Sequence, residues 1–325
     1  MRRRKFITLL GGAALWPLVA RAQQPGTPVI GYLGLYSPSG EVKRISSFLE
    51  GLKEAGFDEG RNVSIEFRFA EGDVSRLPTF VAEFVSRKVT VMFAPSAAAA
   101  LAAKTATSTV PIVFATGADP IQSGLVARLN RPGGNLTGVS FFSPQMESKR
   151  LGLLHELVPK TDLIAVLLNP NNPFFENQLK DVNEASRALG VKIHIETASN
   201  ERDITAAFNA FAQQHAGAVL VGGDPYYTGR RALVIDPAVQ LRLPAIYEWR
   251  EFAEAGGVMS YGTVLTEADK QAGDYVARIL KGESPADLPV MQSSKFEFVI
   301  NLKTARQIGI EVPPTLSARA DEVIE

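Results

Sequence analysis

The 325-residue chain contains no cysteine and only three histidines, His155, His194 and His215. The missing thiols exclude disulfides, a cysteine nucleophile, a thiolate metal site and the lipid-modified cysteine that tethers some exported proteins to a membrane. The three histidines are far apart in the sequence, so a histidine-rich metal site is not expected. We therefore do not expect a bound metal ion.

Signatures of enzymes are scarce as well. The glycines after the first predicted strand, Gly31, Gly34 and Gly40, do not form a G-x-G-x-x-G turn, and no Walker lysine motif occurs. A G-x-S-x-G nucleophile elbow is also missing. Acids spaced like Glu248 and Glu251 are common on solvated helices and do not indicate a general acid–base pair. We therefore expect no cofactor and no enzymatic activity.

Long apolar runs are confined to the N-terminus. Residues 1–22 have the order of a cleavable signal peptide: cations at 2–5, an apolar segment at 6–19 and small residues around a cleavage site at 20–22. Residues 3–7 are similar to the twin-arginine pattern but lack the preceding Ser or Thr. An ordinary Sec signal and an N-terminal anchor are the alternatives, although about 14 apolar residues fall short of the ~20 that span a bilayer. We expect a soluble, untethered periplasmic protein.

The whole chain has no excess of either charge, because it has 34 basic and 34 acidic residues. Residues 1–22 carry five of the basic residues and no acid, so their removal leaves 29 basic against 34 acidic residues. Nucleic-acid sites need a basic face. The negative balance therefore argues against a nucleic-acid partner.

Hydrophobic periodicity predicts two successive α/β series. A chain with 46% hydrophobic residues can bury a sizeable core, and at this length two lobes are favoured over one. The first series has strands at 29–35, 63–69, 89–94 and 112–115 and helices at 42–55, 77–87 and 97–106. After Gly/Pro/Asn punctuation, the second has strands at 136–142, 163–168, 191–196, 218–221 and 245–247 and helices at 146–158, 176–189, 204–214 and 230–241. The alternation predicts two doubly wound, mostly parallel sheets.

The C-terminal elements can join either lobe. They are strands at 258–261 and 296–300 and helices at 267–280 and 302–308. The punctuation at 130–135 is expected to separate the two series.

Candidate binding residues follow the predicted strands. In parallel sheets, ligands bind beyond the carboxyl ends of the strands, where loops lead to helix N-termini with free N–H groups. Here these loops combine hydroxyls, amides, acids and aromatic rings, which suits a small ligand with polar ends and an apolar body. The candidates are Tyr36, Ser37, Ser96, Ala97, Thr116, Asp119, Phe142, Asn172, Asp224, Tyr247 and Tyr261.

Several candidates have a second interpretation. Ser96 opens an alanine-rich helix, either as an N-cap alone or as part of a carboxylate site with the following N–H groups. Asp119 and Asp224 precede prolines and either shape turns or pair with a ligand cation. Residues 169–173 are expected to form a turn, with contact to a ligand as the less favoured alternative. Most aromatic candidates are expected to pack in the core.

Five stretches carry a resemblance to a known family. They are residues 119–126, 131–140, 255–262, 296–305 and 318–324. They resemble the substrate-binding proteins of ABC uptake transporters, in the group of tryptophan-binding TrpX-like proteins. The resemblance implies a type I periplasmic-binding fold, in which three crossovers join the lobes. The implied lobes are 28–138 with 263–286, and 139–262 with 287–325.

The resemblance also implies roles for candidate residues. Ser96 and Thr116 match positions that hold a ligand carboxylate, and Asp224 and Tyr247 match positions near a ligand amine. An arginine that could reach the carboxylate is not evident at any strand end, so an amino-acid ligand does not follow from the resemblance alone.

The implied function is capture of a small organic solute, such as an amino acid or an aromatic acid, by closure of the lobes. The protein would act as a monomer and deliver the solute to the membrane permease of an ABC transporter. One alternative is a ligand-sensing partner of a membrane histidine kinase, which shares the fold. The other is an exported α/β enzyme, which would need the dinucleotide loop that the sequence lacks.

Overall fold

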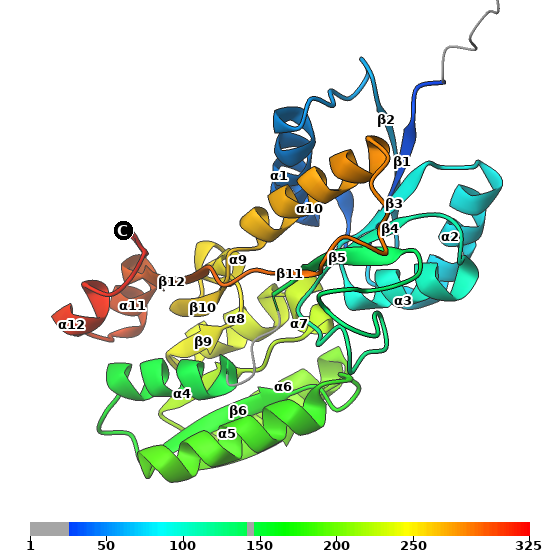
Figure 1. Cartoon of the computed structure of the whole chain (residues 1–325). Coiled ribbons are helices and arrows are strands. Elements are labelled where there is room, and N and C mark those ends of the chain that lie inside the picture. The colour runs from blue at the N-terminus through cyan, green and yellow to red at the C-terminus, as the bar shows by residue number, and fades with distance from the viewer. Residues whose placement is uncertain (1–25, 142–145) are drawn as a thin grey trace, which may run out of the picture.

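The protein has two α/β lobes in a computed structural model that describes residues 26–141 and 146–325 (Figure 1). The predicted α/β architecture with two lobes is confirmed. The segment 1–22, expected to be a signal peptide, lies outside the described residues. Within the described ranges, every helix is too short or too polar to cross a bilayer.

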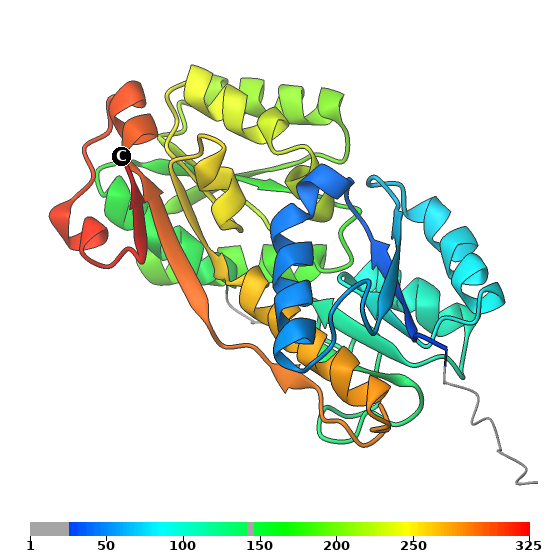
Figure 2. The same cartoon turned by 90° about the horizontal axis from the view of Figure 1, so that it is seen from above.

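The first lobe is a six-stranded parallel sheet in the order β11-β5-β4-β3-β1-β2. Its strands are β1 (Val29–Gly34), β2 (Ser64–Phe69), β3 (Val91–Ala94), β4 (Ile112–Thr116), β5 (Leu136–Ser140) and β11 (Met291–Gln292). Its helices are η1 (Pro38–Gly40), α1 (Val42–Glu54), η2 (Val74–Arg76), α2 (Leu77–Ser86), α3 (Ala97–Ala106) and α10 (Leu265–Leu280). Helices α1 and α10 cover one face and α2 and α3 the other, which explains the continuous apolar runs in the central strands (Figure 2).

The second lobe is a seven-stranded sheet in the order β13-β12-β10-β9-β8-β6-β7. Its strands are β6 (Leu163–Leu168), β7 (Lys192–Thr197), β8 (Ala218–Val221), β9 (Ala245–Tyr247), β10 (Met259–Thr263), β12 (Phe296–Asn301) and β13 (Glu322–Ile324). Its helices are α4 (Met146–Leu157), α5 (Phe175–Leu189), α6 (Glu201–Gln213), α7 (Pro225–Gly229), α8 (Ala232–Gln240), α9 (Arg250–Glu254), α11 (Leu302–Ile308) and α12 (Pro314–Ser317). Strand β12 runs antiparallel to β10, because the chain returns from the first lobe to form it.

The punctuation at 130–135 does not separate the lobes, and that expectation was wrong. Strand β5 follows it, yet β5 pairs with β4 along its whole length, from Leu136 beside Ile112 to Ser140 beside Thr116. Local turn chemistry marks the end of an element but does not encode which sheet the next strand joins.

Three connections join the lobes, after β5, between β10 and α10, and between β11 and β12. Strands β5 and β11 thus extend the first lobe a few residues beyond the expected boundaries at 138 and 286. The connections lie side by side, because the Ser293 N–H donates to the Ser140 carbonyl at 2.8 Å and the Val264 N–H to the Lys295 carbonyl at 3.0 Å. Of the elements that the sequence left open, α10 joins the first lobe and β10, β12 and α11 join the second.

Candidate functional site

The two lobes meet at the loops that follow their strands. Tyr36, after β1, lies against α7, where a side chain on Gly229 would meet the tyrosine ring at 3.4 Å. Phe141, after β5, meets the Trp249 ring edge-on, with centroids 5.9 Å apart. The carboxyl ends of the strands, where a parallel sheet binds its ligands, therefore form one shared surface, which we call the interlobe junction.

A salt bridge at the rim also connects the lobes. The Lys43 ammonium of α1 lies 2.6 Å from the Glu254 carboxylate of α9. Polar and aromatic groups of the two lobes are thus in contact.

Glu248 places a carboxylate at the interlobe junction, directly after β9. Within residues 26–141 and 146–325, no hydrogen bond or salt bridge reaches this carboxylate. Burial raises the pKa of Glu248 from 4.5 to about 8, while attraction to Arg150 opposes the rise and repulsion from Glu147 adds to it. The Glu248 side chain is partly exposed, and its carboxylate has neither a hydrogen-bond nor an ion-pair partner among the described residues, so it is a candidate to receive a cationic group.

Two glycines make room for Glu248, Gly223 in the loop after β8 and Gly262 in β10. A side chain on Gly223 would lie 2.5 Å from the Glu248 carboxylate, and one on Gly262 would lie 1.9 Å from the Glu248 backbone oxygen. Any larger residue would have to displace Glu248. The close backbone approach therefore fixes where the carboxylate lies.

Arg150 is the cation that opposes the raised pKa of Glu248. Its guanidinium already has other partners. Its guanidinium donates two hydrogen bonds of 2.8 Å to the Glu147 carboxylate and one of 2.8 Å to the Tyr261 carbonyl. Since Glu147 balances the charge of Arg150, Glu248 is left without an ion-pair partner among the described residues.

The first lobe contributes the N-terminus of α3. Ser96 caps this helix, because its hydroxyl oxygen accepts the Ala99 N–H at 3.2 Å. In the described part of the chain, the N–H groups of Ser96, Ala97 and Ala98 have no acceptor. Free N–H groups at the positive end of a helix suit an anion. The capping role is thus present, and the carboxylate-binding role of Ser96 and Ala97 stays a prediction.

The other polar candidates of the first lobe shape their own loops. Thr116 is buried, and its hydroxyl oxygen accepts the Ala118 N–H at 3.0 Å. Asp119 accepts the Ile121 N–H at 2.8 Å, as the turn interpretation predicts. Ser37 similarly caps η1.

Asp224 and Asn172 come together, but they satisfy each other. The Asp224 carboxylate accepts hydrogen bonds from the side chains of Asn169 and Asn172 at 3.0 and 2.9 Å, and it caps α7 through the Tyr226 N–H at 2.8 Å. Only 4% of the residue is exposed. The structure therefore uses Asp224 to shape a loop, and Glu248 holds the unpaired carboxylate.

Two aromatic candidates make ring contacts within the second lobe, Tyr247 in the core and Tyr261 at its edge. Tyr247 is 1% exposed; its ring stacks on Phe252 at 4.9 Å and its hydroxyl donates to the Val234 carbonyl at 3.3 Å. Tyr261 stacks on Phe296 at 6.0 Å. The expectation that Tyr247 faces a ligand amine is corrected, because this side chain points into the core beneath α8. Phe142 lies outside the described residues.

Two buried charged residues that the sequence analysis missed hold the loops of the first lobe: Glu41, the N-cap of α1, and Arg44, in its first turn. Glu41 accepts the Tyr36 N–H and the Tyr32 hydroxyl, both at 2.8 Å. Arg44 donates to the Pro95 carbonyl at 2.9 Å and to Asp269. Charged residues on an amphipathic helix are normally solvated, so periodicity alone does not identify such braces.

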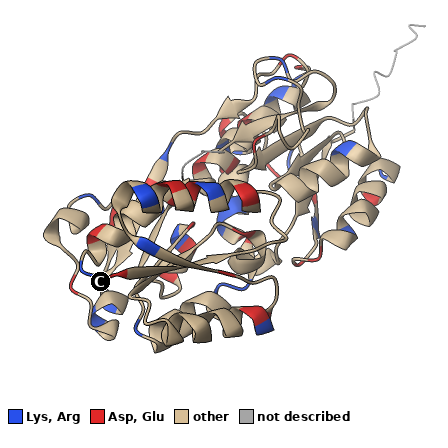
Figure 3. Cartoon of the chain, turned by 90° about the horizontal axis from the view of Figure 1, so that it is seen from below, with Lys and Arg blue, Asp and Glu red and all other residues tan. Residues whose placement is uncertain are grey.

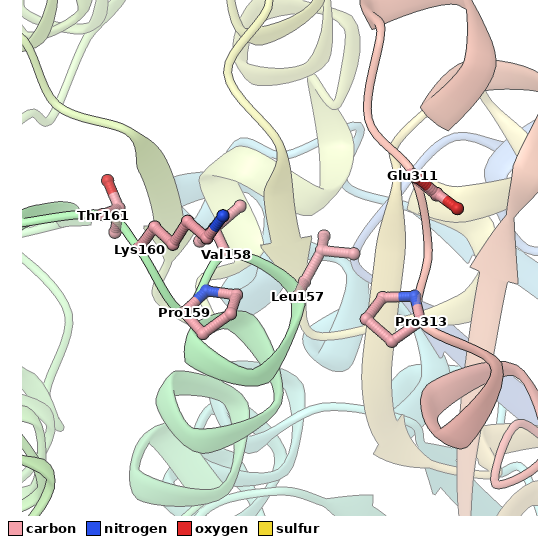
Figure 4. A pocket seen from close by; sticks show the side chains of 7 residues that line it. All are labelled: Leu157, Val158, Pro159, Lys160, Thr161, Glu311 and Pro313. Carbon is pink, nitrogen blue, oxygen red and sulfur yellow. The ribbon is translucent and has the colours of Figure 1, made fainter.

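A separate pocket of about 390 Å³ lies at the end of α4 (Figure 4). Its lining residues are Leu157, Val158, Pro159, Lys160, Thr161, Glu311 and Pro313. Strand β6 begins just after this segment, so the pocket lies at the amino ends of the strands, opposite the interlobe junction. It is not where a parallel sheet places its ligand.

Charge is mixed over both lobes, with acidic and basic residues interspersed along the helices (Figure 3). In the described ranges, no three His, Asp or Glu side chains gather closely enough to hold a metal ion. The distinctive chemistry of the junction is thus the unpaired acid in one lobe and the free N–H groups in the other.

Comparison with known proteins gives the same architecture. The family model described as "ABC transporter substrate binding protein" matches residues 35–324. The tyrosine-binding protein of Clostridioides difficile is 25% identical over 83% of this chain and 77% of its own length. A structure from Streptococcus pneumoniae, described as an ABC domain in complex with L-Trp, has a TM-score of 0.83 and 25% identity, covering 92% of this chain and all of that one. The structure of a conserved domain protein of Vibrio cholerae has a TM-score of 0.83 and 28% identity, and the match covers 91% of this chain and 99% of that one.

Proposed function

Because this chain belongs to the family of ABC transporter substrate-binding proteins, we propose that it captures an α-amino acid between its two lobes. The observation that carries this proposal is the Glu248 carboxylate, which lacks a partner among the described residues and lies at the interlobe junction. Relatives whose names or descriptions refer to tyrosine and L-Trp support an amino-acid ligand. An aromatic acid without an amine would leave Glu248 unpaired, so the amino acid is favoured.

Each lobe holds one end of the ligand. The ammonium group pairs with Glu248 of the second lobe, and the carboxylate accepts hydrogen bonds from the N–H groups of Ser96 and Ala97 in the first lobe. A ligand that touches both lobes binds the closed form more tightly than the open form and shifts the population toward closure.

The rings at the junction suit an apolar side chain on the ligand. Tyr36 comes from the first lobe, and the Phe141 and Trp249 rings meet where the lobes join. Aromatic residues with a polar group nearby are typical walls of small-molecule sites. We therefore propose an aromatic or large aliphatic amino acid.

The setting of this function is also a proposal. A leader at residues 1–22 and the cysteine-free remainder support a soluble periplasmic protein. The protein would act as a monomer and deliver its ligand to the membrane permease of an ABC transporter, as its family membership suggests.

A thermal-shift comparison of matched ligands tests the proposed ligand class. L-tryptophan and L-tyrosine should raise the melting temperature, because a ligand that binds only the native state stabilises it by mass action. Indole-3-propionate and 3-(4-hydroxyphenyl)propionate, which lack only the amine, should not. Equal stabilisation by the deaminated acids, or no shift with any of the 20 amino acids, would contradict the proposal.

Replacing Ser96 by Ala is expected to weaken amino-acid binding by about 1–3 kcal/mol, because the Ser96 hydroxyl, whose oxygen accepts the Ala99 N–H, also donates its proton to the ligand carboxylate beside the backbone N–H groups. The variant also loses a helix cap, worth about 1 kcal/mol of stability. Asn200→Ala is the matched control, because Asn200 caps α6 through the Asp203 N–H at 3.0 Å and follows β7, the edge strand of the other lobe. Calorimetric titration should show weaker binding for Ser96→Ala alone, whereas both variants should melt earlier. Wild-type affinity in Ser96→Ala would leave Ser96 as a cap only.

A further inference from the structure

Arg44 is a buried cation that joins three parts of the first lobe. Its Nε and Nη2 atoms donate to the two oxygens of Asp269 at 2.7 and 2.8 Å, and its Nη1 atom donates to the Pro95 carbonyl at 2.9 Å. Arg44 is 8% exposed and Asp269 is fully buried. Only the planar guanidinium fork can make all three contacts from one side chain.

The bond to Pro95 fixes the orientation of the Ser96 N–H. The Pro95 carbonyl and the Ser96 N–H belong to one planar trans peptide unit, so they point in opposite directions. When Arg44 holds the carbonyl toward α1, the Ser96 N–H points away from α1. This N–H has no acceptor in the described ranges.

The other end of the brace is anchored on α10, the helix that directly follows the second crossover. Helices α1 and α10 touch at two glycines: a side chain on Gly51 would lie 2.0 Å from the Lys270 carbonyl, and one on Gly273 would lie 2.3 Å from the Phe48 carbonyl. Figures 1 and 2 show the two helices side by side. Asp269 therefore sits where the backbones of α1 and α10 are in close contact.

We propose that Arg44 is a positioning residue for the ligand carboxylate: through the Pro95 carbonyl it aims the Ser96 N–H at the interlobe junction. This inference rests on the proposed amino-acid ligand. It goes beyond a stabilising role, because the Asp269 pair alone would hold α1 against α10. The additional bond to Pro95 couples that support to the loop between β3 and α3.

The test compares two ligands on two proteins. Arg44→Lys keeps the charge beside Asp269 but loses the fork that also holds Pro95. It should bind the amino acid about tenfold more weakly, as expected for misplacing a hydrogen bond to a charged group, and should bind the corresponding amino-acid amide as wild type does. The amide keeps the ammonium but lacks the carboxylate, so it reports on the rest of the site.

Arg68→Lys is the matched control. Arg68 also combines a carboxylate, Glu83 at 2.7 Å, with a backbone carbonyl, that of Phe67 at 2.9 Å, but it does not touch the loop before α3. For Arg68→Lys, the ratio of the affinity for the amino acid to the affinity for its amide should equal that of the wild type. If Arg44→Lys folds poorly, Asp269→Asn, which weakens the anchor of Arg44, should show the same selective loss.

Equal weakening of acid and amide binding in the Arg44 and Asp269 variants would overturn the positioning role and leave a structural one. An unchanged affinity for both ligands would overturn it as well. Failure of the wild-type protein to bind any amino acid would instead refute the proposed function, so the two failures are distinguishable.

Discussion

Replacing Glu248 by Gln should weaken amino-acid binding by about 2–5 kcal/mol, or roughly thirtyfold to several thousandfold. Gln has almost the same shape, so the packing against Gly223 and Gly262 is kept. The neutral amide cannot form an ion pair with the ligand ammonium. Isothermal titration of both proteins with the same amino acid at pH 8.5 measures the difference.

Asp224→Asn is the contrasting variant, because the sequence analysis predicted that Asp224 could pair with the ligand cation. Its carboxylate already accepts hydrogen bonds from Asn169, Asn172 and the start of α7, so this variant should lose stability more than affinity. Glu248→Gln should show the reverse, since it removes an acid with a raised pKa and no partner among the described residues, and it should leave the ligand-free protein at least as stable at high pH. A Glu248→Gln variant that binds like wild type would refute the role of Glu248.

Amino-acid affinity should rise with pH until about 8 and then level off. In the ligand-free protein, burial raises the pKa of Glu248 to about 8, so the carboxyl group is protonated at lower pH. The ligand ammonium favours the ionised form, and binding therefore releases a proton below that pH. Affinity should increase by up to about tenfold per pH unit, since one unit corresponds to about 1.36 kcal/mol.

Titrations in buffers with different ionisation enthalpies count the protons released on binding. Near pH 7 the wild type should release most of one proton, and Glu248→Gln should release none. The stability of the ligand-free protein changes with pH in the opposite direction to the affinity. Because the folded pKa lies above the unfolded value of 4.5, the native state binds more protons between about pH 4.5 and 8, and Glu248 lowers stability as pH rises through that window. A pH-independent affinity in the wild type would contradict the assignment.

Most of the fold could be predicted from the sequence because each long element has its own period. The strand at 163–168 and the helix at 97–106, for example, form with the predicted bounds. Strand β11, with two residues, and helix α9, with five, are too short to give a periodic signal. The sheet that β5 joins depends on partners that are distant in sequence, so the turn at 130–135 pointed to the wrong boundary.

The site was less predictable, because it depends on which face of an element a side chain takes. Tyr247 and Glu248 are adjacent in sequence, but the tyrosine ends a strand and packs into the core, while the glutamate begins the loop at the junction. Successive residues at a strand end point in opposite directions, which is the signal that could have favoured Glu248. Its spacing from Glu251 suggested a solvated helix instead. The braces Arg44 and Glu41 are visible only in three dimensions.

The most direct test of an amino acid held between the lobes is a crystal structure of the protein with the amino acid that raises its melting temperature most. Ligand density should lie at the interlobe junction, with the ammonium group at Glu248 and the carboxylate at the N-terminus of α3. Density in the pocket between Leu157 and Pro313, or at the junction with the ammonium group directed away from Glu248, would contradict the account.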